Sequence, residues 1–250
     1  MHLYLNELKE LLSGGLIERK AYTSQLLGSN QSGFNPCVQA FNNSSVECIK
    51  LLFEFIDEAY KNKIITKKEY NDFFTKRNKN KFSALDSALI SGDVEKLKLF
   101  LEKVDALQEK GIISIRDCKR LLLNVNKDGF TPFHQVLRTN NRDCLVLYLN
   151  KLINIKLTYE DIDRLCTTRV NITGSNILHF AASTNDVEMI KLVVKFFCRE
   201  MPNAKKYIKT MLEQKNNNGK LPYAKDLAMN EYLSMLSRIF RDGDEHNRHC

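Results

Sequence analysis

The sequence lacks the signals that mark membrane and secreted proteins. No apolar run approaches the roughly 18 residues that a helix needs to span a bilayer. Near the amino terminus, Glu7, Lys9 and Glu10 interrupt the only apolar stretch, which argues against a secretory signal. We therefore expect a cytoplasmic protein. Its 250 residues, 43% of them hydrophobic, supply enough apolar material for a continuous core.

The motifs of common enzymes and metal sites are also missing. None of the seven cysteines forms a C-x-x-C pair, and we interpret them as small buried hydrophobes in a reducing compartment. No Gly-rich phosphate loop, G-x-S-x-G or H-E-x-x-H motif is present. His246, His249 and Cys250 cluster only loosely, in what we expect to be a flexible tail over residues 241–250. The sequence predicts no metal, no cofactor and no enzymatic activity.

What the sequence does contain is an internal repeat with spacings of 48, 48, 45 and 45 residues. The copies begin at Asn30, Asn78, Asn126, Asn171 and Asn216. Three residues later stand Gly33, Lys81, Gly129, Gly174 and Gly219. Asn at the first and Gly at the fourth position are typical of a type I turn, so each repeat opens on a turn. A repeat of this size cannot bury its apolar face alone, which predicts a solenoid of about four to five stacked repeats.

Each turn is followed by signals for two helices. Proline stands three residues after the glycine in three copies and suits the first turn of a helix, with Thr131 as the cap in the clearest copy. A second helix follows a polar break, and its expected caps are Ser44 or Ser45, Asp93, Asn141 and Asp186. Apolar residues spaced by three and four place one apolar stripe on the second helix, which forms the core between repeats.

A third helix is expected in each repeat. Thr66, Ser114 and Thr158 stand at matching places, and each is followed three residues later by an acid, as in a capping box. Three helices in 45 to 48 residues also describe HEAT or armadillo repeats, which are the alternative fold.

Two runs of the sequence resemble the ankyrin repeat. The family's D-G-x-T-P-L-H is similar to Asp128-Gly129-Phe-Thr131-Pro132-Phe133-His134, and its L-H-x-A-A to Leu178-His179-Phe-Ala181-Ala182. The register extends this resemblance over nearly the whole chain, although an ankyrin repeat needs only about 33 residues. The resemblance implies a finger-like turn, two antiparallel helices with the first lining a concave face, and structural roles for His134 and His179. We therefore predict an all-α, ankyrin-like solenoid in which each repeat carries an extra third helix.

We expect one solenoid over residues 1–240, with repeats starting at about 30, 78, 126, 171 and 216. Residues 1–29 match the second and third helices of a repeat at the same 48-residue offset. Two explanations remain open: a half-repeat that acts as a polar cap, or a chain cut from something longer.

The ankyrin resemblance implies that partners contact the finger tips and the exposed side of the first helix. Phe34, Phe82 and Phe130 follow the turn glycine position in three consecutive repeats and predict an aromatic ladder that a partner could use. The alternative is that each ring packs between adjacent fingers. The other predicted contact positions are Ser32, Asn80, Asp128, Thr173 and Asn218 on the tips and Asn42, Arg138, Ser183 and Met229 on the helices.

The charge distribution offers a second hypothesis. The net charge is +8, and basic residues concentrate in the stretches 61–81 and 195–225. Such patches attract nucleic acid, anionic membranes or acidic proteins, and a simple solvated face is the other explanation. Nucleic acid binding usually needs interleaved aromatics, but Tyr70, Phe73 and Phe74 lie on a stripe that we expect to be buried.

We predict a monomeric module that binds another protein. Tryptophan is absent, glycine is scarce and the loops are rich in Asn and Lys. These traits resemble the elongated ankyrin arrays of effector proteins that intracellular bacteria deliver into host cells, which implies a eukaryotic host protein as the partner and the host cytoplasm as the location. The alternatives are a basic surface for nucleic acid or anionic membrane, and the interaction part of a longer enzyme.

Overall fold

A computed structural model describes residues 2–200, 204–222 and 230–236. Met229 and the expected tail at 241–250 lie outside these ranges. The chain divides into two compact units, residues 1–121 and 122–250. Within the described ranges the secondary structure is helical and no strand occurs, which confirms the predicted all-α class.

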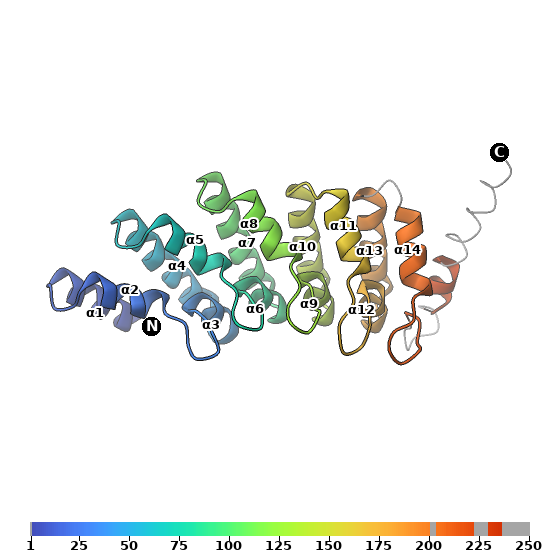
Figure 1. Cartoon of the computed structure of the whole chain (residues 1–250), viewed down its shortest axis with the longest axis horizontal. Coiled ribbons are helices and arrows are strands. Elements are labelled where there is room, and N and C mark those ends of the chain that lie inside the picture. Colours follow the sequence, from blue (N-terminus) through green and yellow to red (C-terminus); the bar gives the residue numbers. More distant parts are fainter. Residues whose placement is uncertain (1, 201–203, 223–229, 237–250) are drawn as a thin grey trace. The chain divides into compact units, whose positions relative to one another are not determined.

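The first unit holds two complete copies of a short helix, a long helix and a third helix (Figure 1). The first copy consists of α3 (Pro36–Asn43), α4 (Val46–Lys61) and α5 (Lys67–Thr75). The second consists of α6 (Ala84–Ile90), α7 (Val94–Glu109) and α8 (Ile115–Leu123), whose last residues, Leu122 and Leu123, fall in the second unit. α1 (His2–Ser13) and α2 (Arg19–Leu27) precede them and match a second and a third helix in register.

The second unit continues the same order of elements. Its first repeat contains α9 (Pro132–Arg138), α10 (Arg142–Asn154) and α11 (Tyr159–Thr167). The next contains α12 (Ile177–Ser183), α13 (Val187–Glu200) and α14 (Ala204–Glu213). A fifth turn follows at Asn216, and residues 230–236 are helical.

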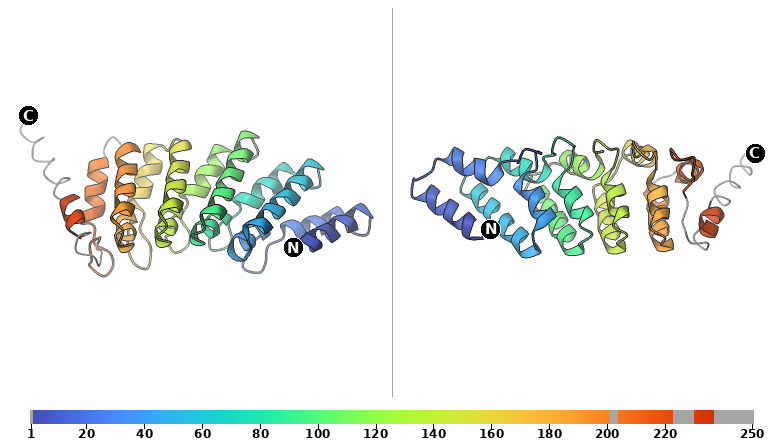
Figure 2. Two further views of the ribbon diagram at one scale, coloured as in Figure 1. Left: turned by 180° about the vertical axis from the view of Figure 1, so that it is seen from behind. Right: turned by 90° about the horizontal axis from the view of Figure 1, so that it is seen from below.

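Equivalent helices pack against each other within each unit. In the first unit α3 contacts α6, and α4 contacts both α1 and α7; in the second, α9 contacts α12, α10 contacts α13 and α11 contacts α14. Figure 2 shows from behind the long helices of each unit lying side by side. Side-by-side packing of repeated turn, helix and helix is the ankyrin-like arrangement, and the third helix that accounts for the longer period is present as predicted.

The predicted turns form through the asparagine side chain. The Asn126 Oδ1 accepts hydrogen bonds from the backbone N–H groups of Asp128 and Phe130, each at 2.9 Å, and the Asn126 N–H donates to the Phe130 carbonyl. The same Oδ1 bond to the residue four positions on is made by Asn30, Asn78 and Asn216. The asparagine therefore closes the turn in four of the five copies.

The fourth turn differs from the prediction. It begins one residue earlier, because the Gly174 N–H donates to the Val170 carbonyl, at 2.7 Å, instead of to the Asn171 carbonyl. Asn171 bonds instead to the preceding turn, donating from its backbone to the Asp128 carbonyl and from its side chain to the Lys127 carbonyl. Val170 is buried, with 1% of its surface exposed, so burial of this apolar residue accompanies the wider turn.

Side-chain caps begin the helices where the sequence placed them. Ser45, Asp93 and Asn141 cap α4, α7 and α10, and Asp186 accepts a bond from the Glu188 N–H at the start of α13. Thr66 and Thr158 form complete capping boxes at α5 and α11, and Ser114 bonds reciprocally with Asp117 at α8. Thr131 caps α9.

The third helices are tied from one repeat to the next in the first unit. The Arg19 side chain donates to the Ile64 carbonyl at 2.6 Å, and the Asn71 side chain donates to the Ile112 carbonyl at 2.9 Å. The two carbonyls occupy the same position 48 residues apart. These side-chain bonds attach a third helix to the loop that leads into the next third helix.

The core follows the predicted stripes, with two exceptions among the cysteines. Tyr70, Phe73 and Phe74 are at most 3% exposed, as expected. Four cysteines are buried, but Cys48 is half-buried and Cys198 is exposed near the end of α13, so the interpretation of every cysteine as a buried hydrophobe is wrong for these two.

In the described ranges, no helix combines the length and the apolar character that crossing a membrane requires.

Candidate protein-binding surface

The predicted contact residues lie on the turns and on the first helices of their repeats. The polar ones within the described residues are all exposed: Ser32, Asn42, Asn80, Asp128, Arg138, Thr173, Ser183 and Asn218. The three phenylalanines Phe34, Phe82 and Phe130 are half-buried. Each unit thus presents polar tips with a partly accessible aromatic ring beside them.

In the first unit the ladder consists of one pair. The rings of Phe34 and Phe82 meet edge to face, with centroids 6.0 Å apart and planes 84° to each other. This geometry is favourable for two aromatic rings and places each ring between adjacent turns. The rings therefore pack on each other, as the alternative explanation expected, and still keep part of their surface accessible.

In the second unit Phe130 has different neighbours. Its ring lies 5.7 Å from the ring of Phe180, and the Arg138 guanidinium stands over it at 5.0 Å from the centroid. Position 175 of the next turn, where a repeated phenylalanine would stand, is Ser175. The aromatic partner comes instead from α12, and the cation over the ring adds a cation–π contact.

Phe180 is a surface residue that the repeat pattern did not single out. It is half-buried and occupies the position that Gln135 holds one repeat earlier, so no aromatic recurs there. The repeat pattern gave no signal for its accessibility, because the equivalent Gln135 is only 2% exposed.

A hollow of about 300 Å³ lies beside Phe180 in the second unit. It is lined by Thr173, Ser175, His179, Phe180, Ser183, Asn216, Lys220 and Leu221. Two of these, Thr173 and Ser183, were predicted contact residues. The hollow therefore joins the fourth turn, the exposed side of α12 and the fifth turn into one concave surface.

The two histidines support the turns and helices around this surface. The His179 Nε2 donates to the Lys220 carbonyl at 3.0 Å, which ties α12 to the fifth turn. The His134 Nδ1 lies 2.8 Å from the Thr131 hydroxyl, and burial lowers the pKa of His134 to about 3. Burial also lowers the pKa of His179. A fully buried imidazole with so low a pKa is unsuited to general base catalysis near neutral pH.

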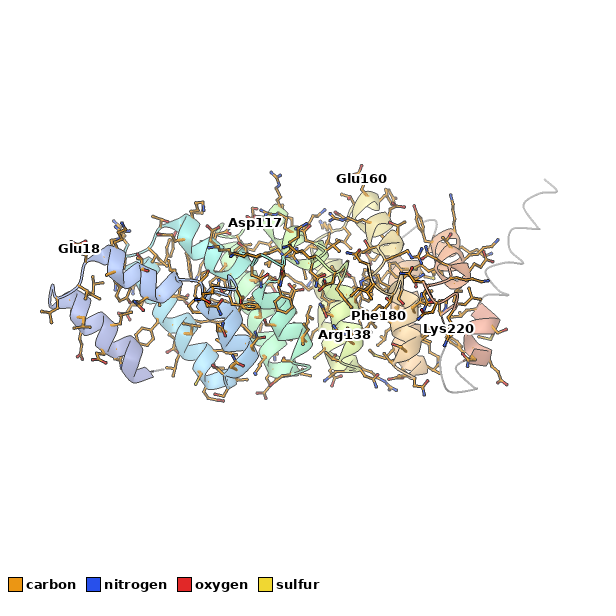
Figure 3. All side chains as sticks on the ribbon, turned by 60° about the horizontal axis from the view of Figure 1, so that its bottom comes forward. Glu18, Asp117, Arg138, Glu160, Phe180 and Lys220 are labelled. Atoms are coloured by element: carbon orange, nitrogen blue, oxygen red, sulfur yellow. The ribbon has the colours of Figure 1, made fainter. Side chains whose placement is uncertain are left out.

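The exposed charges on the turns and first helices of the second unit are mostly positive. Exposed cations stand on its turns and first helices: Lys127, Arg138, Lys215 and Lys220. One exposed acid, Asp128, stands on these turns, and the other exposed acids among the described residues of the unit lie on its second and later helices: Asp143, Glu160, Glu188, Glu213 and Glu231. In Figure 3 Arg138, Phe180 and Lys220 follow one another along one side of this unit, and Glu160 lies at the opposite edge. The concave side is therefore basic and partly aromatic.

The basic stretch at 61–81 does not form one patch. Lys61, Lys63, Lys67 and Lys68 surround the start of α5, whereas Lys76, Lys79 and Lys81 follow its end. A helix of this length separates the two groups by roughly 13 Å. Arg77 points inward and lies 3.6 Å from the buried carboxylate of Asp86.

Among the described residues, no group of three or more His, Cys, Asp and Glu side chains could hold a metal ion.

No protein-family model and no curated protein matches the sequence. Solved structures with similar folds include a chain from the complex of the predatory endopeptidase Bd0816 of Bdellovibrio bacteriovorus with immunity protein Bd3460. It shows 14% identity and a TM-score of 0.39, over 86% of this chain and 98% of that one. The ankyrin repeat domain of Bcl-3, a member of the IκB family, gives 12% identity and a TM-score of 0.39 over 82% and 100% of the two chains.

The human ASB11 ankyrin repeat domain gives 16% identity and a TM-score of 0.26, over 81% of this chain and 98% of that chain. TM-scores below 0.5 are too low to support a conclusion about partners or chemistry. The evidence for the ankyrin-like fold is in the repeats themselves: their turns, their helix pairs and their side-by-side packing.

Proposed function

We propose that this chain is a protein-binding module whose partner contacts the turns and the exposed sides of the first helices. The observation that carries the proposal is the repeated placement of exposed polar tips beside half-buried aromatic rings, with Phe34 and Phe82 in one unit and Phe130 and Phe180 in the other. Rigid aromatic rings supply contact area at a low entropic cost, and they are enriched among the residues that dominate binding. The module needs no chemistry of its own for this role.

The test is a double substitution of rings that are not fully buried. Phe82→Ala with Phe130→Ala should weaken binding of a captured partner protein by about 2 kcal/mol or more, because such anchors carry a large share of interface energy. Thermal unfolding should stay cooperative, since each ring already has solvent on one side. Affinity is measured by titration calorimetry with the purified partner, and Glu54→Ala, at an exposed position of α4 outside the predicted contact residues, serves as the control. Unchanged affinity in the double variant would remove the rings from the binding surface.

The more specific proposal is that the partner is a eukaryotic host protein and that the chain is a bacterial effector acting in the host cytoplasm. The composition of the sequence supports this proposal, because the loops are rich in Asn and Lys and tryptophan is absent. A pull-down from host-cell lysate with mass spectrometry, comparing wild type with the double phenylalanine variant, identifies the candidate. A partner captured equally by both proteins would not be bound through this surface.

Nucleic acid or anionic membrane is the second candidate, favoured by the exposed lysines around the start and end of α5. A surface that tracks phosphates loses affinity steeply between low and moderate salt. Retention on heparin and binding to an arbitrary duplex therefore test this candidate, and no binding at low salt would exclude it. The division of these lysines into two groups makes a continuous phosphate track less favourable than a protein partner.

A further inference from the structure

We infer that the concave surface of the second unit takes an acidic segment of the partner protein, with an apolar side chain in the hollow beside Phe180 and carboxylates paired to Arg138 and Lys220. This inference rests on the proposed function and specifies the chemistry of the partner at one place. Three features of the surface carry it: a cation held in place over a ring, a second cation on a fixed turn, and an apolar floor between polar walls.

Arg138 is the first cation. It is the last residue of α9, it is exposed, and its guanidinium stands over the Phe130 ring at 5.0 Å from the centroid. One nitrogen donates to the Gln135 Oε1 at 3.2 Å. The ring and the amide orient the planar guanidinium before any partner arrives, so less side-chain entropy is lost when a carboxylate binds.

Lys220 is the second cation, and the turn that carries it is fixed by three hydrogen bonds. Its N–H donates to the Asn216 Oδ1 at 3.0 Å, and its carbonyl accepts from the Asn216 N–H at 2.8 Å and from the His179 Nε2 at 3.0 Å. The side chain itself is exposed. A firmly held backbone with an exposed ammonium group presents a positive charge at the rim of the hollow.

The floor of the hollow is apolar. The half-buried Phe180 ring and Leu221, which is 45% exposed, line it together with the small polar side chains of Thr173, Ser175 and Ser183. A volume of about 300 Å³ exceeds that of one large apolar side chain. Burial of a leucine or phenylalanine side chain there would be favourable, and the hydroxyls can bond the partner's backbone.

Charge complementarity selects an acidic occupant. The turns and first helices of this unit expose four cations, Lys127, Arg138, Lys215 and Lys220, and one acid, Asp128. Charged groups that complement a partner raise the association rate and exclude partners of like charge. A nucleic acid strand fits less well, because bases stack on open ring faces and the Phe130 face is already covered by Arg138.

The experiment uses the full chain and pools of short labelled peptides. Each peptide has a central Leu or Phe flanked by two residues on either side; these are Asp or Glu in the acidic pool, Asn or Gln in the neutral pool and Lys or Arg in the basic pool. Fluorescence anisotropy should show the acidic pool binding about tenfold or more tightly than the neutral pool, with no binding of the basic pool. Combined Arg138→Glu and Lys220→Glu substitutions should abolish the preference.

The control variant is Lys205→Glu with Lys206→Glu, which changes the net charge equally but acts on exposed residues of α14. It should leave the preference for the acidic pool intact. Phe180→Ala should weaken the acidic pool while retaining the charge preference. Three results would overturn the inference. The first is an equal effect of both charge-reversed variants, and the second is equal affinity for the acidic and neutral pools. The third is displacement of the acidic pool by an arbitrary duplex that binds the same surface more tightly.

The failure of this inference can be told apart from a failure of the proposed function. A protein partner that is released by the double substitution of Phe82 and Phe130, but not by charge reversal of Arg138 and Lys220, would leave the protein-binding function in place and remove the acidic segment.

Discussion

At the scale of single residues, the motif position that holds His134 is occupied by different residue types in different repeats. In the second repeat the same position is Asp86, which is fully buried, bonds to the Ser83 hydroxyl and lies near Arg77. In the fourth repeat it is His179, whose Nε2 reaches the Lys220 carbonyl. Asp86, His134 and His179 each bond the cap of their helix, whereas the first repeat has Val38 at this position and its cap Asn35 bonds elsewhere.

The low pKa of His134 predicts how stability changes with pH. In the unfolded chain a histidine titrates near about 6.5, whereas burial holds the folded pKa at about 3. Between these values the unfolded state binds a proton that the folded state excludes. The contribution of His134 is therefore fully present above about pH 6.5 and falls by up to about 1.4 kcal/mol per pH unit as the pH drops toward 3.

The measurement compares urea unfolding of wild type and His134→Asn from pH 7.5 to 4.5. Asparagine keeps an acceptor for the cap but does not titrate, so the variant should lose stability less steeply below pH 6.5. Other titrating groups contribute equally to both proteins and cancel in the difference. Parallel pH profiles for the two proteins would show that His134 is protonated as easily in the folded state as in the unfolded one.

At the scale of elements, the turns are stacked by direct backbone contact in the second unit. Gly129 has φ +87°, and a Cβ at this position would stand 2.7 Å from the Arg169 carbonyl oxygen and from the Asn171 nitrogen. Gly219 occupies the matching place in the fifth turn with φ +73°, but no atom of the described residues lies within 4 Å of its added Cβ. The two glycines share a backbone conformation and differ in how closely the next turn approaches.

This pair gives a matched test of turn stacking. Gly219→Ala should cost about 1 kcal/mol, the strain of a side chain at positive φ. Gly129→Ala should cost roughly 1–3 kcal/mol more, because the added methyl group meets backbone that must shift. Denaturant unfolding of the two variants measures the difference. Equal losses would mean that the turns are not packed as closely as described.

The elements also show what the sequence could reveal. Capping residues and turn asparagines act on backbone groups a few residues away, so Thr66, Thr158 and Asn126 could be assigned from spacing alone. α14 was not indicated by a hydroxyl and acid pair like those before α5, α8 and α11. The wider fourth turn and the contact of Phe180 with Phe130 depend on packing between repeats, which no local spacing encodes.

At the scale of the whole molecule, the 48-residue register runs without interruption past the boundary between the two compact units. The boundary after Leu121 falls inside α8, shortly before the turn at Asn126, so it does not coincide with the start of a repeat. Periodicity predicted the repeats and their helices, but it contains no signal for this division. A single solenoid over residues 1–240 stays a prediction, as do the partner and the contact residues.

The central claim is that a partner protein binds the turns and first helices. Hydrogen–deuterium exchange of the full chain, measured with and without the captured partner, tests it most directly. We predict slower exchange in the turns at 126–130, 170–175 and 216–221 and at the exposed ends of α9 and α12, with α11 and α14 unchanged. Protection concentrated in the third helices, with the turns exchanging as in the free protein, would contradict the account.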